Sequence, residues 1–185
     1  MREMYSSLQV FGGSKDDVPG CTTKVDDGSV FEINGIRVTC FHTPCHTKGH
    51  ILYYCEPVAA TDGSQANAKE GGYQTVKNVN RCIFTGDTIF IGGCGRFFEG
   101  TAAEMAYAMS VMRDKIPQDT KMFCGHEYTE ANLKFCIQAD PENASIPAKA
   151  AEVEALKAAG WASVPTTVTE ERSYNVFMRC FDEGM

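Results

Sequence analysis

The order of the predicted secondary structure elements most constrains how this chain can fold. Short segments rich in Ile, Val, Phe and Tyr and bounded by Gly or Asp are typical of β-strands, and they crowd the first two thirds of the 185 residues. The predicted strands are Leu8–Phe11, Val30–Ile33, Ile36–Phe41, Ile51–Cys55, Arg81–Thr85 and Lys121–Cys124. Asn34-Gly35 lies between two of them and indicates a two-residue hairpin turn.

Helical patterns follow later in the chain, from Thr101 onward. A capping box at Thr101 and Glu104 predicts the start of the first helix. One face of that helix, which we expect to pack in the core, consists of Met105, Ala108, Met109 and Met112. Two further helices are expected over Glu130–Gln138 and over Ala148–Ala159, with Pro147 near the start of the latter and Gly160 as its stop. Strands followed by helices predict an α/β or α+β fold with a helical C-terminal part.

The segment between two predicted strands, Glu56–Asn80, has a different composition from the rest of the chain. It is rich in Ala, Gly, Asn, Gln, Thr and Lys and shows no apolar period. We therefore predict a long, mobile surface loop over residues 56–80.

Charge and composition exclude several classes of function. The chain has 17 basic and 24 acidic residues, a formal net charge of −7, and no cluster of Lys and Arg, which argues against general nucleic-acid binding. No apolar run is long enough to span a bilayer, and no signal peptide is visible after Met1. The nine cysteines are an odd number without C-x-x-C spacing. They indicate reduced thiols of a cytosolic protein, most of them small buried hydrophobic residues.

Three polar residues follow predicted strands at the points where those strands end. His46 comes after Ile36–Phe41, Asp87 after Arg81–Thr85, and His126 after Lys121–Cys124. Because α/β folds place functional side chains at the ends of rigid strands, we expect these three side chains to come together in one site.

Each of these residues also has a simpler interpretation. Asp87 before Thr88 could form a turn or cap a helix, and His46 and His50 could hydrogen-bond within a turn. A structural zinc site that combines Cys45-His46 with Cys124-Gly125-His126 is a further alternative, although neither pair has zinc-finger spacing.

Four segments of the sequence together resemble a known enzyme family. They are Thr43-Pro44-Cys45-His46-Thr47-Lys48-Gly49-His50, Phe84-Thr85-Gly86-Asp87-Thr88, Gly93-Cys94-Gly95-Arg96-Phe97-Phe98-Glu99-Gly100 and Cys124-Gly125-His126-Glu127-Tyr128-Thr129. In order and spacing they resemble glyoxalase II, hydroxyacylglutathione hydrolase, and the tail Tyr174–Arg179 matches too, with Val176 where the family usually has proline. The resemblance implies a metallo-β-lactamase αββα sandwich over residues 1–126 and a shortened C-terminal helical substrate-binding domain over residues 127–185.

The resemblance also implies a mechanism and a role for each site residue. His46 would bind one divalent metal ion and His126 a second, with Asp87 bridging the two, and zinc, iron or manganese would suit these ligands. A metal-activated hydroxide would hydrolyse S-2-hydroxyacylglutathione thioesters, such as S-lactoylglutathione, to lactate and glutathione in methylglyoxal detoxification. Arg96 and Tyr128 would contact the glutathione part of the substrate. Phe98 stands where the family often has a tyrosine hydroxyl.

Besides the shortened C-terminal domain, the sequence departs from the family at its N-terminal end. The motif Thr-His-x-His-x-Asp-His, which the resemblance implies would supply four more metal ligands, does not occur, so we expect an N-terminally truncated sandwich with a weak or incomplete metal site. A non-catalytic short form that binds a ligand or partner stays open, as does another metallo-β-lactamase-fold hydrolase. The complete protein is expected to be a cytoplasmic monomer that binds no nucleic acid or membrane. A mitochondrial location also stays open, because a transit peptide would lie upstream.

Overall fold

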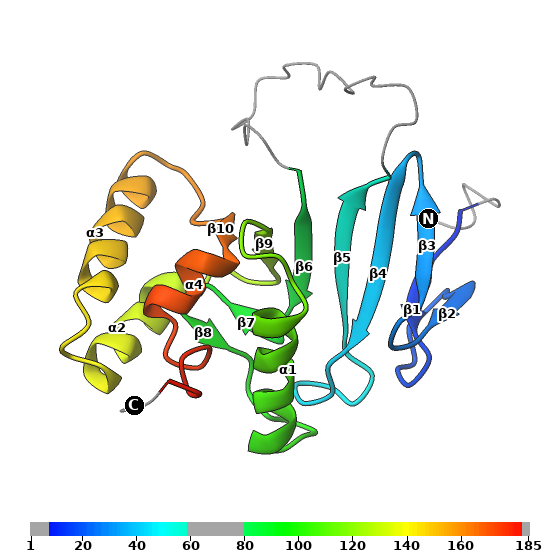
Figure 1. The fold of residues 1–185 in the computed structure, drawn as a ribbon, viewed down its shortest axis with the longest axis horizontal. Coiled ribbons are helices and arrows are strands. Elements are labelled where there is room, and N and C mark those ends of the chain that lie inside the picture. Colours follow the sequence, from blue (N-terminus) through cyan, green and yellow to red (C-terminus); the bar gives the residue numbers. More distant parts are fainter. Residues whose placement is uncertain (1–7, 59–79, 183–185) are drawn as a thin grey trace.

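The computed structural model describes residues 8–58 and 80–182, and Figure 1 shows their fold. The strands are β1 (Phe11–Gly13), β2 (Thr23–Val25), β3 (Val30–Ile33), β4 (Ile36–His42), β5 (Ile51–Pro57), β6 (Cys82–Gly86), β7 (Ile89–Phe90), β8 (Gly93–Cys94), β9 (Lys121–Cys124) and β10 (Thr166–Thr167). The helices are α1 (Ala102–Asp114), α2 (Thr129–Ala139), α3 (Ser145–Ala158) and α4 (Val168–Tyr174).

Six of the strands form one mixed sheet in the order β10-β9-β6-β5-β4-β3. The pairs β4–β5 and β5–β6 are antiparallel, whereas β6–β9 is parallel. Consequently β4, β6 and β9 run in the same direction, and their C-terminal ends lie at one edge of the sheet. The pairs β1–β2 and β7–β8 form two small separate sheets.

The predicted hairpin turn is present between β3 and β4. Asn34 has a φ of 49° and Gly35 a φ of 80°, and a two-residue type I′ turn requires positive φ at both central positions. The turn sets a register in which Ile33 pairs with Ile36 and Val30 with Thr39.

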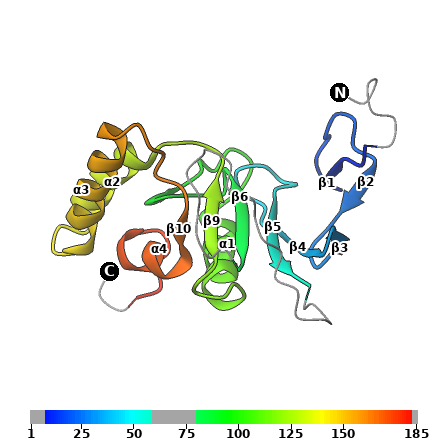
Figure 2. The ribbon, with the colours of Figure 1, turned by 90° about the horizontal axis from the view of Figure 1, so that it is seen from above.

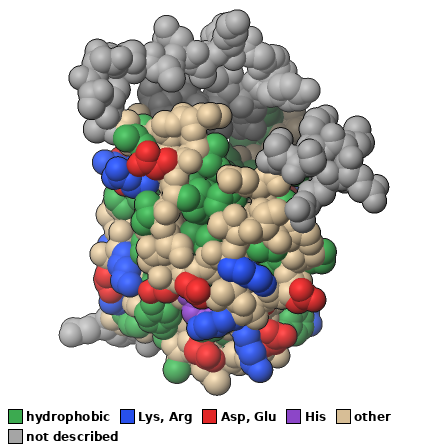
Figure 3. Space-filling view, turned by 90° about the vertical axis from the view of Figure 1, so that its right-hand side faces the viewer, with side chains coloured by type: hydrophobic (Ala, Val, Ile, Leu, Met, Phe, Trp, Pro, Cys, Tyr) green, Lys and Arg blue, Asp and Glu red, His purple; other side chains and the backbone are tan. Residues whose placement is uncertain are grey.

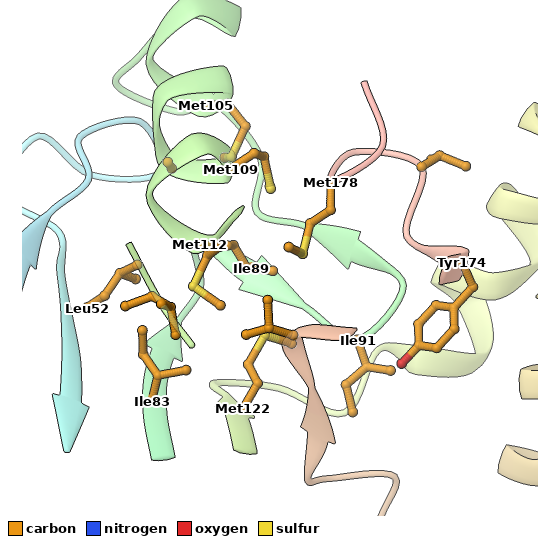
Figure 4. Close-up of a cluster of buried hydrophobic side chains, with 14 of the residues drawn as sticks. Leu52, Ile83, Ile89, Ile91, Met105, Met109, Met112, Met122, Tyr174 and Met178 are labelled. Carbon is orange, nitrogen blue, oxygen red and sulfur yellow. The ribbon is translucent and has the colours of Figure 1, made fainter. Parts of the chain in front are cut away.

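The main core lies between the large sheet and α1, as Figure 4 shows. The Thr101 side chain accepts a hydrogen bond from the Glu104 amide, and the Glu104 carboxylate accepts one from the Thr101 amide, so the expected capping box starts α1. The predicted face is buried, because Met105, Ala108, Met109 and Met112 are each at most 2% exposed. These side chains pack with sheet residues such as Leu52, Ile83 and Met122.

The C-terminal helices lie at the end of the molecule that is far from β3 (Figures 1 and 2). Helices α2 and α3 lie side by side, and β10 joins the sheet by pairing with β9. The buried Asn175 side chain donates hydrogen bonds to the carbonyl oxygens of Phe90 and Gly93. The C-terminal part is thereby tied to the β7–β8 hairpin, next to the strand ends that carry the candidate site.

Several boundaries differ from the sequence prediction. The strand expected at Leu8–Phe11 begins only at Phe11, because the Val10 amide donates to the Thr22 side chain and not to a neighbouring strand. Helix α3 starts three residues before Ala148, and Pro147 lies in its first turn, where a missing N–H costs little. The sequence prediction missed the short strands β2, β7, β8 and β10 and the helix α4.

The cysteine prediction is partly wrong. All nine thiols are free, but only Cys40, Cys45 and Cys136 are buried, because most of the others lie on partly open sheet positions. The predicted loop over residues 56–80 lies mostly outside the described residues, although Glu56 and Pro57 belong to β5. Among residues 8–58 and 80–182, no helix is long and apolar enough to cross a membrane.

Candidate metal centre and adjoining cavity

Three loops at one edge of the large sheet bring His46, Asp87 and His126 together. His46 lies between β4 and β5, Asp87 follows β6, and His126 follows β9, so each comes after one of the three strands that end at this edge. The Asp87 Oδ2 atom lies 3.4 Å from His46 Nε2 and 3.3 Å from His126 Nε2. The convergence expected from the sequence is therefore observed, whereas the metal-binding role of these residues stays a prediction.

The orientation of His46 is fixed by a backbone carbonyl group. Its Nδ1 atom lies 3.0 Å from the carbonyl oxygen of Arg96, and since a carbonyl can only accept, Nδ1 must donate. In the neutral ring the lone pair is then on Nε2, the atom that faces Asp87.

The loop that carries His46 is held by two carboxylates from other parts of the chain. Asp16 accepts hydrogen bonds from the Thr47 hydroxyl and the Gly49 amide, each at 3.1 Å. Glu99 accepts one from the Lys48 amide at 2.7 Å. These bonds order the loop backbone around His46. Neither carboxylate was identified from the sequence, because both are far from His46 along the chain.

The remaining histidines bind backbone groups and do not join the cluster. His42 Nε2 lies 2.7 Å from the Lys48 carbonyl oxygen, and His50 Nε2 lies 3.0 Å from that of Thr85. Burial lowers the pKa of His50, although the hydrogen bond to Thr85 opposes this effect. Through its bond to Thr85, His50 supports the strand end that leads to Asp87.

Two glycines allow the backbone to approach Asp87 closely. A Cβ atom at Gly125 would overlap the Asp87 Oδ1 atom, and one at Gly95 would overlap the Asp87 carbonyl oxygen. The same Cβ at Gly95 would lie 3.0 Å from His46 Nδ1. Any side chain at these positions would displace the carboxylate or the imidazole, so the cluster requires glycine at both.

A cavity of about 500 Å³ opens beside the cluster. His46 and Asp87 line it, together with all three residues expected from the sequence to contact substrate, namely Arg96, Phe98 and Tyr128. The sequence analysis missed Phe90, Cys94, Ala131 and Asn132, which also line it. Cys94 lies within the motif that contains Arg96, and Asn132 follows Tyr128 by one helical turn. Both could therefore have been identified from their sequence distance to a predicted cavity residue.

Aromatic rings form the walls around the two imidazoles. The Phe98 ring lies 5.1 Å from that of His46, and the Tyr128 ring stacks on His126 with centroids 5.0 Å apart. Phe98 is 68% exposed, which leaves its ring available to contact a bound molecule. The cavity therefore combines an apolar wall, one guanidinium, one imidazole and one carboxylate.

The ligating atoms of the cluster are of the kind that a divalent metal ion binds, but there are few of them. Imidazole nitrogen and carboxylate oxygen are ligands for zinc, iron and manganese. Two ligands on one tetrahedral ion lie about 3.4 Å apart when each bond is about 2.1 Å long, which agrees with the 3.3 and 3.4 Å separations. Within the described part of the chain, however, no group of three or more His, Cys, Asp or Glu side chains could hold an ion. The donors found here are thus fewer than the three protein ligands that a catalytic zinc ion usually has.

Comparisons with known proteins agree on one family and one fold. The family model described as hydroxyacylglutathione hydrolase C-terminus matches residues 127–185. The chain is 40% identical to the cytoplasmic hydroxyacylglutathione hydrolase of Arabidopsis thaliana, covering 97% of this chain and 63% of that protein. It is 38% identical to the hydroxyacylglutathione hydrolase of Serratia proteamaculans, covering 98% of this chain and 62% of that protein.

Solved structures show the same fold at lower sequence identity. A metallo-beta-lactamase from Staphylococcus aureus matches with a TM-score of 0.58 and 18% identity, over 96% of this chain and 46% of that one. ETHE1 from Myxococcus xanthus matches with a TM-score of 0.55 and 18% identity, over 94% and 52%. The fold is therefore that of the metallo-β-lactamases, and the chain spans roughly three fifths of the curated relatives it matches.

Proposed function

We propose that this chain, which is similar in sequence to hydroxyacylglutathione hydrolases and has the metallo-β-lactamase fold, serves the hydrolysis of S-2-hydroxyacylglutathione thioesters. The observation that carries this proposal is the position of His46, Asp87 and His126 at the edge of a cavity that also contains Arg96. Hydrolysis of S-lactoylglutathione to lactate and glutathione is the specific reaction we propose, in the cytoplasm.

Two divalent ions would be held by His46 and His126, one on each imidazole, with Asp87 shared between them. A divalent ion at this position supplies Lewis acidity at neutral pH. The chain contributes the orientation of the ligands, since the Arg96 carbonyl fixes the His46 ring and Gly125 leaves room for the Asp87 carboxylate. Because catalytic zinc usually has three protein ligands, these three residues alone form a weak site.

The cavity residues explain why a glutathione thioester is the proposed substrate. Glutathione carries carboxylates, and Arg96 places an exposed guanidinium on the cavity wall of a chain whose net charge is −7. Arg96 would bind a carboxylate, while Phe98 and Tyr128 contact the apolar parts of the substrate. The thioester carbonyl would then lie next to Asp87. Glutathione leaves as a thiolate, and the thiol pKa of about 8.5 makes proton donation to it unnecessary.

The test compares thioester hydrolysis and ligand binding in the same protein. Residues 1–185 with added Mn²⁺ are expected to hydrolyse S-lactoylglutathione faster than a lactoyl thioester of a simple thiol, and Asp87→Asn should abolish the difference. Binding of a non-hydrolysable S-alkylglutathione, measured by calorimetry, should persist in Asp87→Asn because it depends on the cavity. Equal hydrolysis of both thioesters together with no binding of the S-alkylglutathione would contradict the proposal.

A further inference from the structure

Two cysteines lie directly opposite each other on neighbouring strands, away from the candidate metal centre. Cys55 near the end of β5 pairs with Cys82 at the start of β6, in an antiparallel register that also pairs Tyr53 with Phe84. Directly opposed residues on antiparallel strands have Cα atoms about 4.5–5.5 Å apart, which lies within the range of about 4.4–6.8 Å that a disulfide spans. Both thiols are free, and each shifts the pKa of the other.

The two thiols are open to small molecules. Neither side chain belongs to the buried class, and both line a cavity of about 210 Å³ that also includes Arg81 and Glu56. They point away from the core under α1, because their neighbours Tyr54 and Ile83 occupy the core face of the same strands. A dissolved disulfide can therefore reach the pair without unfolding of the sheet.

We propose that Cys55 and Cys82 form a thiol–disulfide exchange site for low-molecular-weight disulfides such as glutathione disulfide. The Cys82 thiolate attacks one sulfur of the small disulfide, whose S–S bond breaks and releases one thiolate, leaving a mixed disulfide on Cys82. Cys55 then loses its proton and attacks the Cys82 sulfur, which expels the second small thiolate. The protein loses two electrons and two protons, and the small disulfide is reduced to two thiols.

The electrostatics of the pair favour Cys82 as the attacking group. The hydrogen bond with Cys55 lowers the pKa of Cys82 to about 7, although burial opposes the shift. The same hydrogen bond and burial raise the pKa of Cys55. At neutral pH Cys82 is thus partly a thiolate while Cys55 keeps its proton, which matches the order of the two steps.

The experiment incubates residues 1–185 with glutathione disulfide, blocks the remaining thiols in acid, and maps the peptides by mass spectrometry. The expected result is two fewer free thiols and one peptide that joins Cys55 to Cys82. Cys55→Ser should stop at a mixed disulfide with one glutathione on Cys82, and Cys82→Ser should lose this reaction. Cys180→Ser, which removes an exposed thiol elsewhere, is the matched control and should behave like the wild type.

The proposal fails if the wild-type peptide map shows no Cys55–Cys82 link, or if glutathione modifies other cysteines first. The wild-type map decides this even if a variant does not fold. Because no thioester or metal enters the experiment, its outcome is independent of the proposed hydrolase function.

Discussion

Arg96 is the residue that we expect to bind a carboxylate of the proposed substrate. Its carbonyl oxygen orients His46, while its exposed side chain lines the cavity. No ion pair of its guanidinium is found within residues 8–58 and 80–182, whereas Arg37, Arg81 and Arg113 each pair with a carboxylate. Arg96 can therefore bind a substrate carboxylate without first breaking an internal contact.

Replacing Arg96 with alanine should weaken binding more than it slows the reaction. A hydrogen bond to a charged group contributes about 1.5–3 kcal/mol, so KM for a glutathione thioester, and Kd for an S-alkylglutathione, should rise roughly 10- to 100-fold while kcat changes less. Calorimetry and initial-rate kinetics measure the two effects. Arg37→Ala, remote from the cavity, should change neither constant, and a large fall in kcat with an unchanged KM would argue against this role for Arg96.

At the scale of elements, α4 contributes a fully buried carboxylate. Glu171 accepts hydrogen bonds from the Tyr174 hydroxyl at 2.6 Å, the Asn175 side chain at 2.8 Å and the Gly92 amide at 3.0 Å. These bonds hold the turn between β7 and β8 against the C-terminal part. Burial nevertheless raises the pKa of Glu171 to about 7, although these bonds lower it.

The raised pKa predicts a specific pH dependence of stability. The folded protein binds the Glu171 proton more tightly than the unfolded chain, whose pKa is near 4.5, so this contribution to stability is complete below about pH 4.5 and is lost as pH rises toward 7. The loss is at most about 1.4 kcal/mol per pH unit in that window. Glu171→Gln, which resembles the protonated form, should remove this dependence.

Urea unfolding of the wild type and of Glu171→Gln at pH 5 and pH 8 measures the effect. The variant should gain stability relative to the wild type on going from pH 5 to pH 8. Glu154→Gln, at an exposed position of α3, serves as the control and should show the wild-type dependence. A constant difference between Glu171→Gln and the wild type at both pH values would contradict the assignment.

Elements with strong local signals could be predicted from the sequence. The strand Val30–Ile33, the Asn34-Gly35 turn and the capped helix at Thr101 agree with the structure because each depends on neighbouring residues. Strands β7, β8 and β10 have two residues each, too few for a periodic pattern, and β10 pairs with the distant strand β9. Helix α4 has only seven residues, too few for an apolar period, although Thr167 and Glu170 form a capping contact.

The candidate site, like the secondary structure, could be predicted only where neighbouring residues carry the information. His46, Asp87 and His126 could be identified because each follows a strand that had itself been predicted. Asp16 and Glu99 could not, since they act on the His46 loop through contacts that only the folded chain creates. The small number of metal-ligating side chains could also be predicted from the sequence, because only four histidines are present.

At the scale of the whole molecule, apolar side chains are exposed on the sheet. Strand β3 is the edge of the large sheet among the described residues, and at this edge Val30 is 56%, Ile33 47% and Ile36 46% exposed. Figure 3, which views the β3 side, shows hydrophobic side chains open at the surface between charged ones. An exposed apolar edge strand is a template for pairing with another chain.

We therefore expect residues 1–185 to self-associate as concentration rises. Light scattering coupled to gel filtration should show an apparent mass that increases with concentration. Ile33→Lys, which places a charge on the edge, should reduce this increase. Ile137→Lys on α2, where the side chain is also exposed, should not, and a concentration-independent monomer mass for the wild type would contradict the prediction.

We expect His46 and His126 each to bind a divalent ion with Asp87 shared between them, and Mn²⁺ binding followed by electron paramagnetic resonance tests this most directly. Mn²⁺ is the appropriate probe because thiolates favour zinc, and nine cysteines would compete for it. We expect the metal-free chain to bind Mn²⁺ weakly. The Mn²⁺ affinity should fall at least roughly tenfold in Asp87→Asn and stay unchanged in the remote Asp119→Asn. Slow thioester turnover, far below the typical enzyme rate of about 10 s⁻¹, should accompany it. Binding that is equal in the wild type and Asp87→Asn would contradict the claim.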